Sequence, residues 1–404
     1  MKHKFPLATA ALALVTILFT PKTAHAAPAC FPAWSATAVY TAGGQASENS
    51  VNYTANWWTQ GNSPDTNNGG SGTGQPWTSN GACSGGGTTN PPPPPPPPPA
   101  GTPLFAPYAD MGITSDENLP TYLTQNGLKA FTLAFIVDNG NCQAGWGGLG
   151  GTIPQDSLPN GSNMLTLIQQ IRSSGGDVVI SFGGASGSDI SSACSSSSQV
   201  QAMYQSVINR YSPTMIDFDI ENGSEKAPNA ILYRSQALAA IKRANPNLYI
   251  SLTLQVLPSG LLTGQVNEGV DILSSAKASG FNPDLINVMA MDYGSSQDNG
   301  GQMGVDAIDA ANATHQQVLS VGLSSAIGVT PMIGVNDTNT EIFQLADAQS
   351  LLSFAQSNSW VKRLSYWSVA RDNGSCAGAG FASSTCSGLS QSSFAFANIF
   401  KAFQ

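Results

Sequence analysis

The sequence predicts an α/β protein whose large C-terminal domain is a (β/α)8 TIM barrel, preceded by a small all-β module. Two observations predict the barrel: eight short apolar segments recur between residues 103 and 404, and stretches with helical spacing lie between them. A third observation separates the module, because an uninterrupted proline run, Pro91 to Pro99, precedes the barrel. A doubly wound open sheet is the alternative, but no Gly-x-Gly-x-x-Gly fingerprint follows the first strand.

The predicted strands are short runs rich in apolar and β-branched residues. In chain order they are Leu104–Ala109, Ala130–Val137, Val178–Phe182, Met215–Ile220, Tyr249–Leu254, Leu285–Met291, Ile327–Ile333 and Leu364–Val369. Between two of them, Met164, Leu167, Ile168 and Ile171 have the spacing of one face of a helix. Regular alternation of strand and helix favours a parallel sheet.

Residues 1–26 have the features of a secretory signal peptide. Met1–Lys4 is basic, Leu7–Phe19 is apolar, and Ala24–Ala26 carries small residues at a cleavage position. The apolar run is shorter than the roughly 20 residues of a membrane span, which argues against an anchor. The mature protein is therefore expected to be secreted and extracellular.

Composition narrows the class of partner. A net charge of −9 and a pI near 4.6 argue against nucleic acid and anionic membranes, both of which call for a basic surface. A neutral polysaccharide meets no such objection. No membrane or nucleic-acid partner is expected, and the chain is expected to act as a monomer.

The cysteine count is even: Cys30, Cys83, Cys142, Cys194, Cys376 and Cys386. In an exported protein these predict three disulfides. Cys30–Cys83 would close the module, while Cys142–Cys194 and Cys376–Cys386 are inferred from order and proximity, because six cysteines allow 15 pairings. Zinc is disfavoured, since there is no Cys-x-x-Cys and His315 is the only histidine left after processing. No metal and no cofactor is expected.

The same scarcity of histidine argues against interpreting the chain as a Ser-His-Asp hydrolase, because the catalytic base would have to be His315. His315 lies in a predicted surface helix and carries no other signal.

Domain boundaries follow from these signals. We predict a module at 27–83, a Gly/Thr/Pro-rich linker at 84–102 and a barrel at 103–404. A polyproline run forms a stiff extended spacer.

The module is rich in aromatic residues: Trp34, Tyr40, Tyr53, Trp57, Trp58 and Trp77. Neighbouring residues on a strand face opposite sides, so Trp57 and Trp58 can place at least one ring outside the core. Exposed flat aromatics are suited to stacking on sugar rings; the alternative is that all six rings form a core. The order Cys30-Phe31-Pro32-Ala33-Trp34, Tyr40-Thr41-Ala42-Gly43-Gly44, Asn56-Trp57-Trp58 and Ala82-Cys83 resembles the family 5/12 carbohydrate-binding modules. That resemblance implies chitin binding through Tyr40, Trp57 and Trp58, with Trp34 and Trp77 in the core.

Three acidic residues alternate in the fourth predicted barrel strand. Asp217, Asp219 and Glu221 are spaced by two, which places them on one face, and the apolar residues between them face the helices. Buried carboxylates raise one another's pKa, and a carboxyl kept protonated near neutral pH is a general acid for glycoside cleavage. Glu221 is the residue at the carboxyl end of the strand, where barrel active sites open. No basic residue on this strand pairs with the acids, which argues against a structural ion-pair network.

Ile216-Asp217-Phe218-Asp219-Ile220-Glu221 resembles most of the Asp-x-x-Asp-x-Asp-x-Glu signature of the family 18 glycoside hydrolases, with Thr214 in place of the first Asp. Ser181-Phe182-Gly183-Gly184 matches the Ser-x-Gly-Gly strand of that family, and Trp367 matches the tryptophan beneath the cleaved sugar. The pattern is most similar to the bacterial D-type chitinases.

The resemblance implies a retaining, substrate-assisted mechanism, in which the substrate's acetamido oxygen replaces a second carboxylate. Glu221 would be the general acid and base, Asp219 would orient the acetamide, and Asp217 would support Asp219.

The sixth predicted strand departs from the family's Met-x-Tyr-Asp. Met291 stands at the tyrosine position, Asp292 matches the aspartate, and Tyr293 comes two residues later. Tyr293 is expected either to reach the cleft or to be a rim aromatic. The other residues expected to contact substrate are Met289, Tyr108 and Gln255, with weaker candidates Asp110, Trp146, Asn336 and Asp337.

These inferences predict a secreted chitinase. The alternatives are an endo-β-N-acetylglucosaminidase, which would share the barrel and the acids, and a non-catalytic chitin-binding lectin.

Overall fold

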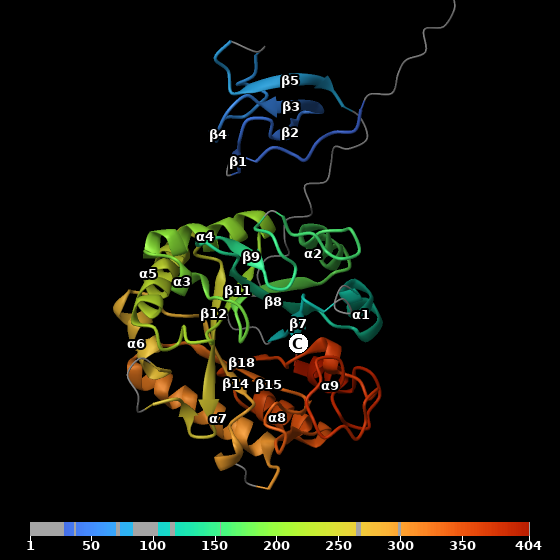
Figure 1. The fold of residues 1–404 in the computed structure, drawn as a ribbon, viewed down its shortest axis with the longest axis vertical. Helices are drawn as coiled ribbons and strands as arrows, with labels where there is room; N and C mark the ends of the chain where they lie inside the picture. Colours follow the sequence, from blue (N-terminus) through green and yellow to red (C-terminus); the bar gives the residue numbers. More distant parts are fainter. Residues whose placement is uncertain are drawn as a thin grey trace, which may run out of the picture. The chain divides into compact units, whose positions relative to one another are not determined.

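The computed structural model describes residues 28–35, 38–69, 73–83, 104–113, 118–153, 155–263, 268–297 and 300–403. The predicted signal peptide and linker lie outside the described residues. The chain divides into two compact units, Met1–Asn90 and Pro91–Gln404, which are described separately (Figure 1).

The first unit is all-β, as predicted. Its strands are β1 (Val39–Tyr40), β2 (Gln45–Glu48), β3 (Val51–Ala55), β4 (Thr59–Gln60) and β5 (Trp77–Ala82). β1 pairs with β4, and β2, β3 and β5 form an antiparallel sheet. Trp77 is fully buried at the centre of the core, and its indole N–H donates to the carbonyl of Asn62 at 2.8 Å. The predicted disulfide Cys30–Cys83 is present.

The strands of the second unit form a closed parallel ring, which confirms the predicted (β/α)8 barrel. The ring consists of β6 (Leu104–Phe105) with β7 (Tyr108–Asp110), β8 (Ala130–Asp138), β10 (Asp177–Gly183), β11 (Met215–Asp219), β12 (Tyr249–Leu257), β14 (Leu285–Ala290), β15 (Ala326–Pro331) and β18 (Val361–Leu364). Each pairs in parallel with the next, and β18 closes the ring on β6.

Two predicted strands need correction. The first, expected as one run from 104 to 109, is divided into β6 and β7, because Pro107 has no N–H to donate at the break. The last, expected at 364–369, ends at Leu364. The strand as it stands, Val361–Leu364, carries Lys362 and Arg363, and these two adjacent charges interrupt the apolar run that would have predicted it.

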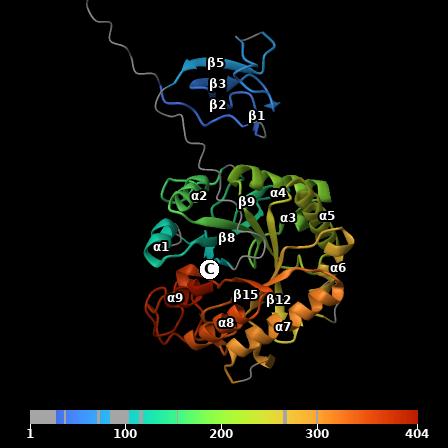
Figure 2. The same ribbon diagram turned by 180° about the vertical axis from the view of Figure 1, so that it is seen from behind.

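The helices surround the ring (Figures 1 and 2). They are α1 (Leu119–Asn126), α2 (Met164–Ser173), α3 (Ile190–Ala193), α4 (Ser197–Tyr211), α5 (Pro228–Ala244), α6 (Val270–Ala278), α7 (Met303–Val321), α8 (Leu345–Ser357) and α9 (Ala395–Phe400). The predicted apolar face of α2 is buried. Within the part of the chain that the structure describes, no helix combines the length and apolarity that crossing a membrane would require.

Short elements lie in the connections that follow the barrel strands and at the end of the last helix. They are the strands β9 (Ala144–Trp146), β13 (Gly260–Leu261), β16 (Gly334–Val335) and β17 (Ile342–Phe343), and the 3-10 turns η2 (Ser295–Gln297), η3 (Val369–Arg371) and η4 (Lys401–Phe403). The remaining predicted disulfides, Cys142–Cys194 and Cys376–Cys386, are both formed.

The orientation of β11 decides which side chains reach the barrel interior. Phe218 packs outward against Tyr204 of α4, with ring centroids 4.8 Å apart, and Ile216 and Ile220 are fully buried. Because alternate residues of a strand face opposite sides, Asp217 and Asp219 face inward. This confirms the predicted division of the strand into an acidic and an apolar face.

Candidate active site

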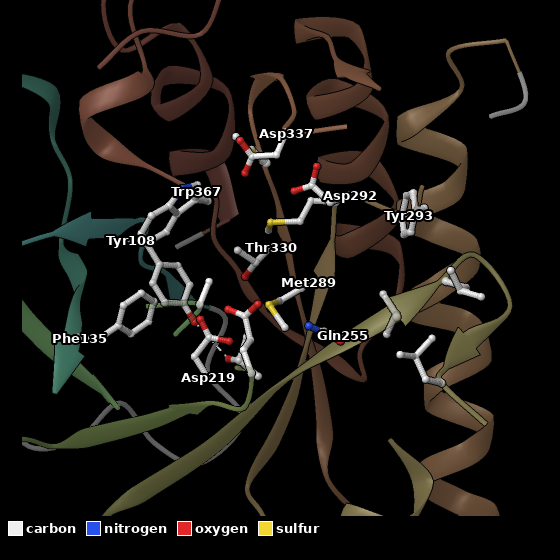
Figure 3. A pocket seen from close by; sticks show the side chains of 18 residues that line it. Tyr108, Phe135, Asp219, Gln255, Met289, Asp292, Tyr293, Thr330, Asp337 and Trp367 are labelled. Carbon is white, nitrogen blue, oxygen red and sulfur yellow. Dashed lines mark hydrogen bonds between the residues drawn. The ribbon is translucent and has the colours of Figure 1, made fainter. Parts of the chain in front are cut away.

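A cavity of about 500 Å³ opens beyond the carboxyl ends of the barrel strands, which is where barrel active sites lie (Figure 3). Most of the residues that the sequence analysis selected line it: Tyr108, Asp219, Glu221, Gln255, Met289, Asp292, Tyr293 and Trp367. Asp217 lies beneath its floor and is fully buried.

Asp217 is surrounded by hydroxyl groups from three other strands. Tyr108 donates to its Oδ2 at 2.8 Å, and Ser181 donates to the same oxygen at 2.7 Å. Thr253 donates to Oδ1 at 2.8 Å, and Ser251 also donates to Oδ1. Asp217 is therefore a fixed floor beneath the cavity and is not exposed to a substrate.

An ion pair, which the sequence analysis did not expect, also reaches Asp217. Arg363, from β18, places its guanidinium 3.6 Å from Oδ1 of Asp217. The strand of the acids indeed carries no basic residue, but barrel closure supplies one from elsewhere. The prediction that no ion pair reaches these acids is therefore wrong for Asp217.

Asp219 and Glu221 lie above this floor and interact with each other. Burial, followed by the charges of Glu221 and Asp217, raises the pKa of Asp219 well above its usual value. Burial also raises the pKa of Glu221, a hydrogen bond with Gln255 opposes the rise, and Glu225 and Asp292 add to it. Oδ1 of Asp219 is buried without a hydrogen-bond partner. The pair thus offers a carboxyl able to keep a proton and an unoccupied acceptor.

Two glycines at the end of β10, Gly183 and the following Gly184, make room for this pair. Gly183 has a φ of +96°, and a Cβ there would lie 2.0 Å from the carbonyl oxygen of Asp219. A Cβ on Gly184 would lie 2.5 Å from the ring of Phe135. The Ser-x-Gly-Gly segment is therefore required by close backbone and ring packing at the site.

Three aromatic side chains form one wall of the cavity (Figure 3). Trp367 stacks on Phe135 with centroids 5.7 Å apart and planes 14° apart. Tyr108 packs against both rings, at 6.0 and 6.1 Å. A flat apolar wall beside acidic groups suits the face of a sugar ring.

The segment after β14 places its residues at different sides of the cavity. Asp292 accepts a hydrogen bond from the Thr338 backbone at 2.7 Å, and burial is the largest cause of its raised pKa. Figure 3 shows Tyr293 on the far side of the cavity from Asp219 and Trp367. The charges that act on the Tyr293 hydroxyl are those of Asp306, Glu341 and Asp309, and burial raises its pKa well above the usual value.

Tyr293 thus lines the cavity without bringing its hydroxyl to the acids of β11. Its catalytic role stays a prediction, and Gln255 is the residue that contacts Glu221. Met289 and Met291 both line the cavity as well.

Some of the weaker candidates lie elsewhere. Trp146 is buried in β9 and donates its indole N–H to Tyr211 at 2.9 Å, so a surface platform there is excluded. Asn336 is fully buried and donates to backbone carbonyls of Met332 and Gly334, so it is not free to bind sugar. Asp337 lines the cavity. Asp110 accepts from the backbone of Gly112 and is not part of the cavity wall.

Four residues at the site were not predicted from the sequence: Phe135, Thr253, Ser251 and Arg363. Ser251, Thr253 and Gln255 alternate along β12 as the acids do along β11, and that alternation of polar residues was a usable signal. Phe135 lies in an apolar run that marks it only as a core residue. His315 lies on α7, as predicted, and stacks on Trp360 at 4.2 Å.

The module's aromatics divide into two groups. Trp57 and Trp58 keep 43% and 60% of their surface exposed. Tyr40 is half-buried, packs edge-on against Trp77 at 4.8 Å, and accepts a hydrogen bond from the Ser35 backbone through its hydroxyl. Trp34 is partly buried against the same core, as predicted. The flat exposed surface is therefore provided by Trp57 and Trp58.

Metal ligands are not gathered at the site. Among the described residues, no group of three or more His, Cys, Asp or Glu side chains is arranged to hold a metal ion. The arrangement offers general acid–base chemistry by a coupled pair of carboxyls.

Comparison with known proteins places the barrel in a family. Residues 105–361 match the glycosyl hydrolases family 18. The chain is 30% identical over 288 residues to the probable bifunctional chitinase/lysozyme of Escherichia coli (strain K12), a match that covers 67% of this chain and 31% of that protein. It is 29% identical over 289 residues to Endochitinase 11 of Metarhizium anisopliae, covering 67% of this chain and 52% of that protein.

The chain thus spans about a third of the length of the first relative and about half of the second. Among solved structures, the catalytic domain of a hyperthermophilic chitinase from Pyrococcus furiosus is 32% identical, with a TM-score of 0.62, and the match covers 74% of this chain and 94% of that one. The matched region contains β11 with its acids and most of the cavity wall. The chain belongs to the glycosyl hydrolases family 18.

Proposed function

We propose that the protein is a chitinase that hydrolyses β-1,4 bonds between N-acetylglucosamine units, with Glu221 as general acid and base. The observation that carries the proposal is the Asp219–Glu221 pair on the wall of the cavity: burial raises the pKa of both carboxyls, and the charge of Glu221 adds to the rise at Asp219. A carboxyl with a raised pKa keeps its proton at the pH where it must donate it. The three relatives compared above all carry the word chitinase or endochitinase in their names.

We infer that the reaction is substrate-assisted and retaining. Glu221 donates its proton to the glycosidic oxygen as the bond to the anomeric carbon breaks. The acetamido oxygen of the same sugar attacks the anomeric carbon and forms an oxazolinium ion. Water then adds to the anomeric carbon and gives its proton to Glu221, which restores the acid.

The geometry supports this route over attack by an enzyme carboxylate. Asp217 is enclosed beneath the floor and cannot reach a substrate carbon. The unpartnered Oδ1 of Asp219 suits an acceptor for the acetamide N–H. The wall formed by Trp367, Phe135 and Tyr108 would support the sugar whose bond is cut.

The decisive experiment replaces Glu221 with Gln, which keeps the shape of the side chain and removes its acid. Turnover of colloidal chitin and of a soluble N-acetylchitooligosaccharide is expected to fall by about 100- to 10,000-fold. Glu225→Gln is the matched control: Glu225 lies outside the cavity wall, so a loss below about tenfold is expected.

Wild-type turnover no higher than that of Glu221→Gln would overturn the enzymatic proposal and favour a lectin. Turnover of N-glycans on a glycoprotein, with none on chitin, would favour the endo-β-N-acetylglucosaminidase. The bacterial D-type subclass belongs to the same proposal and is supported by the motif order in the sequence.

We also propose that residues 27–83 form a carbohydrate-binding module and that the protein is secreted. The exposed Trp57 and Trp58 support the first of these. The three disulfides among the described residues support the second, because such bonds persist in oxidising compartments.

A further inference from the structure

We propose that Arg363 is a positioning residue of the site, which holds Asp217 permanently as a carboxylate and thereby confines the mobile proton to Asp219 and Glu221. This inference rests on the proposed glycosidase function and adds a residue that no motif of the sequence marks. The first supporting observation is where Arg363 lies. It is 3% exposed, inside the barrel on β18, and its guanidinium is 3.6 Å from Asp217.

Side chains from three other strands contact this cation, while its Nε is buried without a hydrogen-bond partner. Arg363 donates to Oγ of Ser251 at 3.3 Å and to the hydroxyl of Thr132, and its charge lies 5.6 Å from the centre of the Tyr108 ring. Gly328 on the adjacent strand leaves the space, since a Cβ there would lie 3.1 Å from Cβ of Arg363. A buried cation is costly unless paired, so its presence calls for a permanent negative charge nearby.

The hydrogen bonds around Asp217 all run in one direction. Arg363 donates to Ser251, which in turn donates to Asp217. On the other side, Asn287 donates its amide N–H to Thr253 at 3.0 Å, and Thr253 donates to Asp217. Because these neighbours give their protons to Asp217, a proton on that carboxyl would displace one of them and leave a buried group unsatisfied.

Asp219 has the opposite surroundings. Its Oδ1 is buried and without a partner, so a proton or a substrate N–H can be accommodated there. With Asp217 negative and Arg363 positive, the floor is close to neutral. The remaining two carboxyls, Asp219 and Glu221, then share their protons as one coupled pair.

Other titratable groups face this set from the neighbouring strands. Tyr108 of β7 contacts Asp217 directly, and the charge of Arg363 also acts on Tyr249 of β12. Burial raises the pKa of both phenols, so they stay neutral across the pH range of the test. Glu225 and Asp292 act on Glu221 from the loops above.

The test measures the pH dependence of kcat/KM on a soluble N-acetylchitooligosaccharide. Its two limbs report the two proton losses of the Asp219–Glu221 pair in the free enzyme. In Arg363→Met the cation that favours ionisation is gone, so the acidic limb is expected to move to higher pH by about one unit or more, and the basic limb in the same direction. Thr132→Val is the matched control: it removes a hydrogen bond of Arg363 but keeps its charge, so Tm falls while the limbs stay in place.

In a second variant the limbs are expected to move in the opposite direction, and this variant tests the role of the Arg363–Asp217 pair if Arg363→Met does not fold. In Asp217→Asn the negative charge beside Asp219 is removed and Arg363 is left uncompensated, so both limbs are expected to move to lower pH. Unmoved limbs in Asp217→Asn would mean that Asp217 was already protonated, and unmoved limbs in a folded Arg363→Met would mean that Arg363 has only a structural role. Either result overturns the inference while the wild type remains active, whereas an inactive wild type would overturn the proposed function itself.

Discussion

At the scale of single residues, the position of Glu221 depends on Gln255. Gln255 ends the alternating polar row of β12, the strand paired with β11, and hydrogen-bonds the Glu221 carboxyl. A hydrogen bond to the charged form of an acid lowers its pKa, so Gln255 partly offsets the rise that burial causes. Gln255 therefore fixes the position of the proposed acid and lowers its pKa.

Replacing Gln255 with Met is expected to raise the pKa of Glu221, because the bond that favours its carboxylate is lost. The basic limb of kcat/KM should move to higher pH, and kcat should fall by about tenfold as the carboxyl loses its anchor. A pH series on a soluble oligosaccharide measures both. Gln317→Met is the control, since Gln317 hydrogen-bonds the backbone of Leu261 and is not among the residues that line the cavity. A basic limb that moved to lower pH would contradict this role.

At the scale of elements, β10 and β11 must approach closely at their carboxyl ends. Gly183 pairs with Asp219 in the parallel register, and its positive φ turns the chain away immediately after the strand. The position of Asp219 thus depends on a glycine of the neighbouring strand as well as on its own.

Gly183→Ala is expected to reduce stability by about 2–5 kcal/mol, since a new Cβ would overlap the Asp219 carbonyl and the residue would keep an unfavourable φ. Thermal unfolding of the barrel measures this, and chitooligosaccharide turnover should fall as Asp219 is displaced. Gly175→Ala is the matched control: its φ is +85°, with no atom within 4 Å of a new Cβ, so only the backbone cost of about 1–2 kcal/mol applies. Equal losses in the two variants would show that the contact with Asp219 has no energetic consequence.

At the scale of the whole molecule, two units carry different surfaces. The barrel has a concave acidic site, and the first unit presents exposed tryptophans outside its core. We expect the first unit to hold the protein on an insoluble polymer while the barrel cuts single chains.

The double variant Trp57→Ala/Trp58→Ala is expected to weaken retention on insoluble chitin by tenfold or more. Each ring that becomes buried against the polymer contributes roughly 1.5–3 kcal/mol to binding. Turnover of a soluble oligosaccharide should be unchanged. Val39→Ala is the control: it removes an exposed apolar side chain of the same unit, 51% exposed, without removing a ring. Pull-down with colloidal chitin decides it, and retention equal to wild type would refute the stacking assignment.

Much of the fold could be predicted because its signals are local. The acids of β11 and the apolar face of α2 follow directly from the periods of strand and helix. The errors occurred where local signals conflict. Pro107 divides the first strand, and the charged pair Lys362 and Arg363 conceals the last one.

By itself, the sequence determined the family motif, the inward face of Asp217 and Asp219, and the even set of cysteines. Only the tertiary structure decided what those acids meet: Arg363 from the last strand, Tyr108 from the first, and Phe135 opposite Trp367. The reason is that a strand's side-chain period depends on neighbouring residues alone, whereas the contents of a barrel interior depend on closure. Closure brings side chains from strands far apart in the chain to one axis, where a buried charge must find its counter-charge.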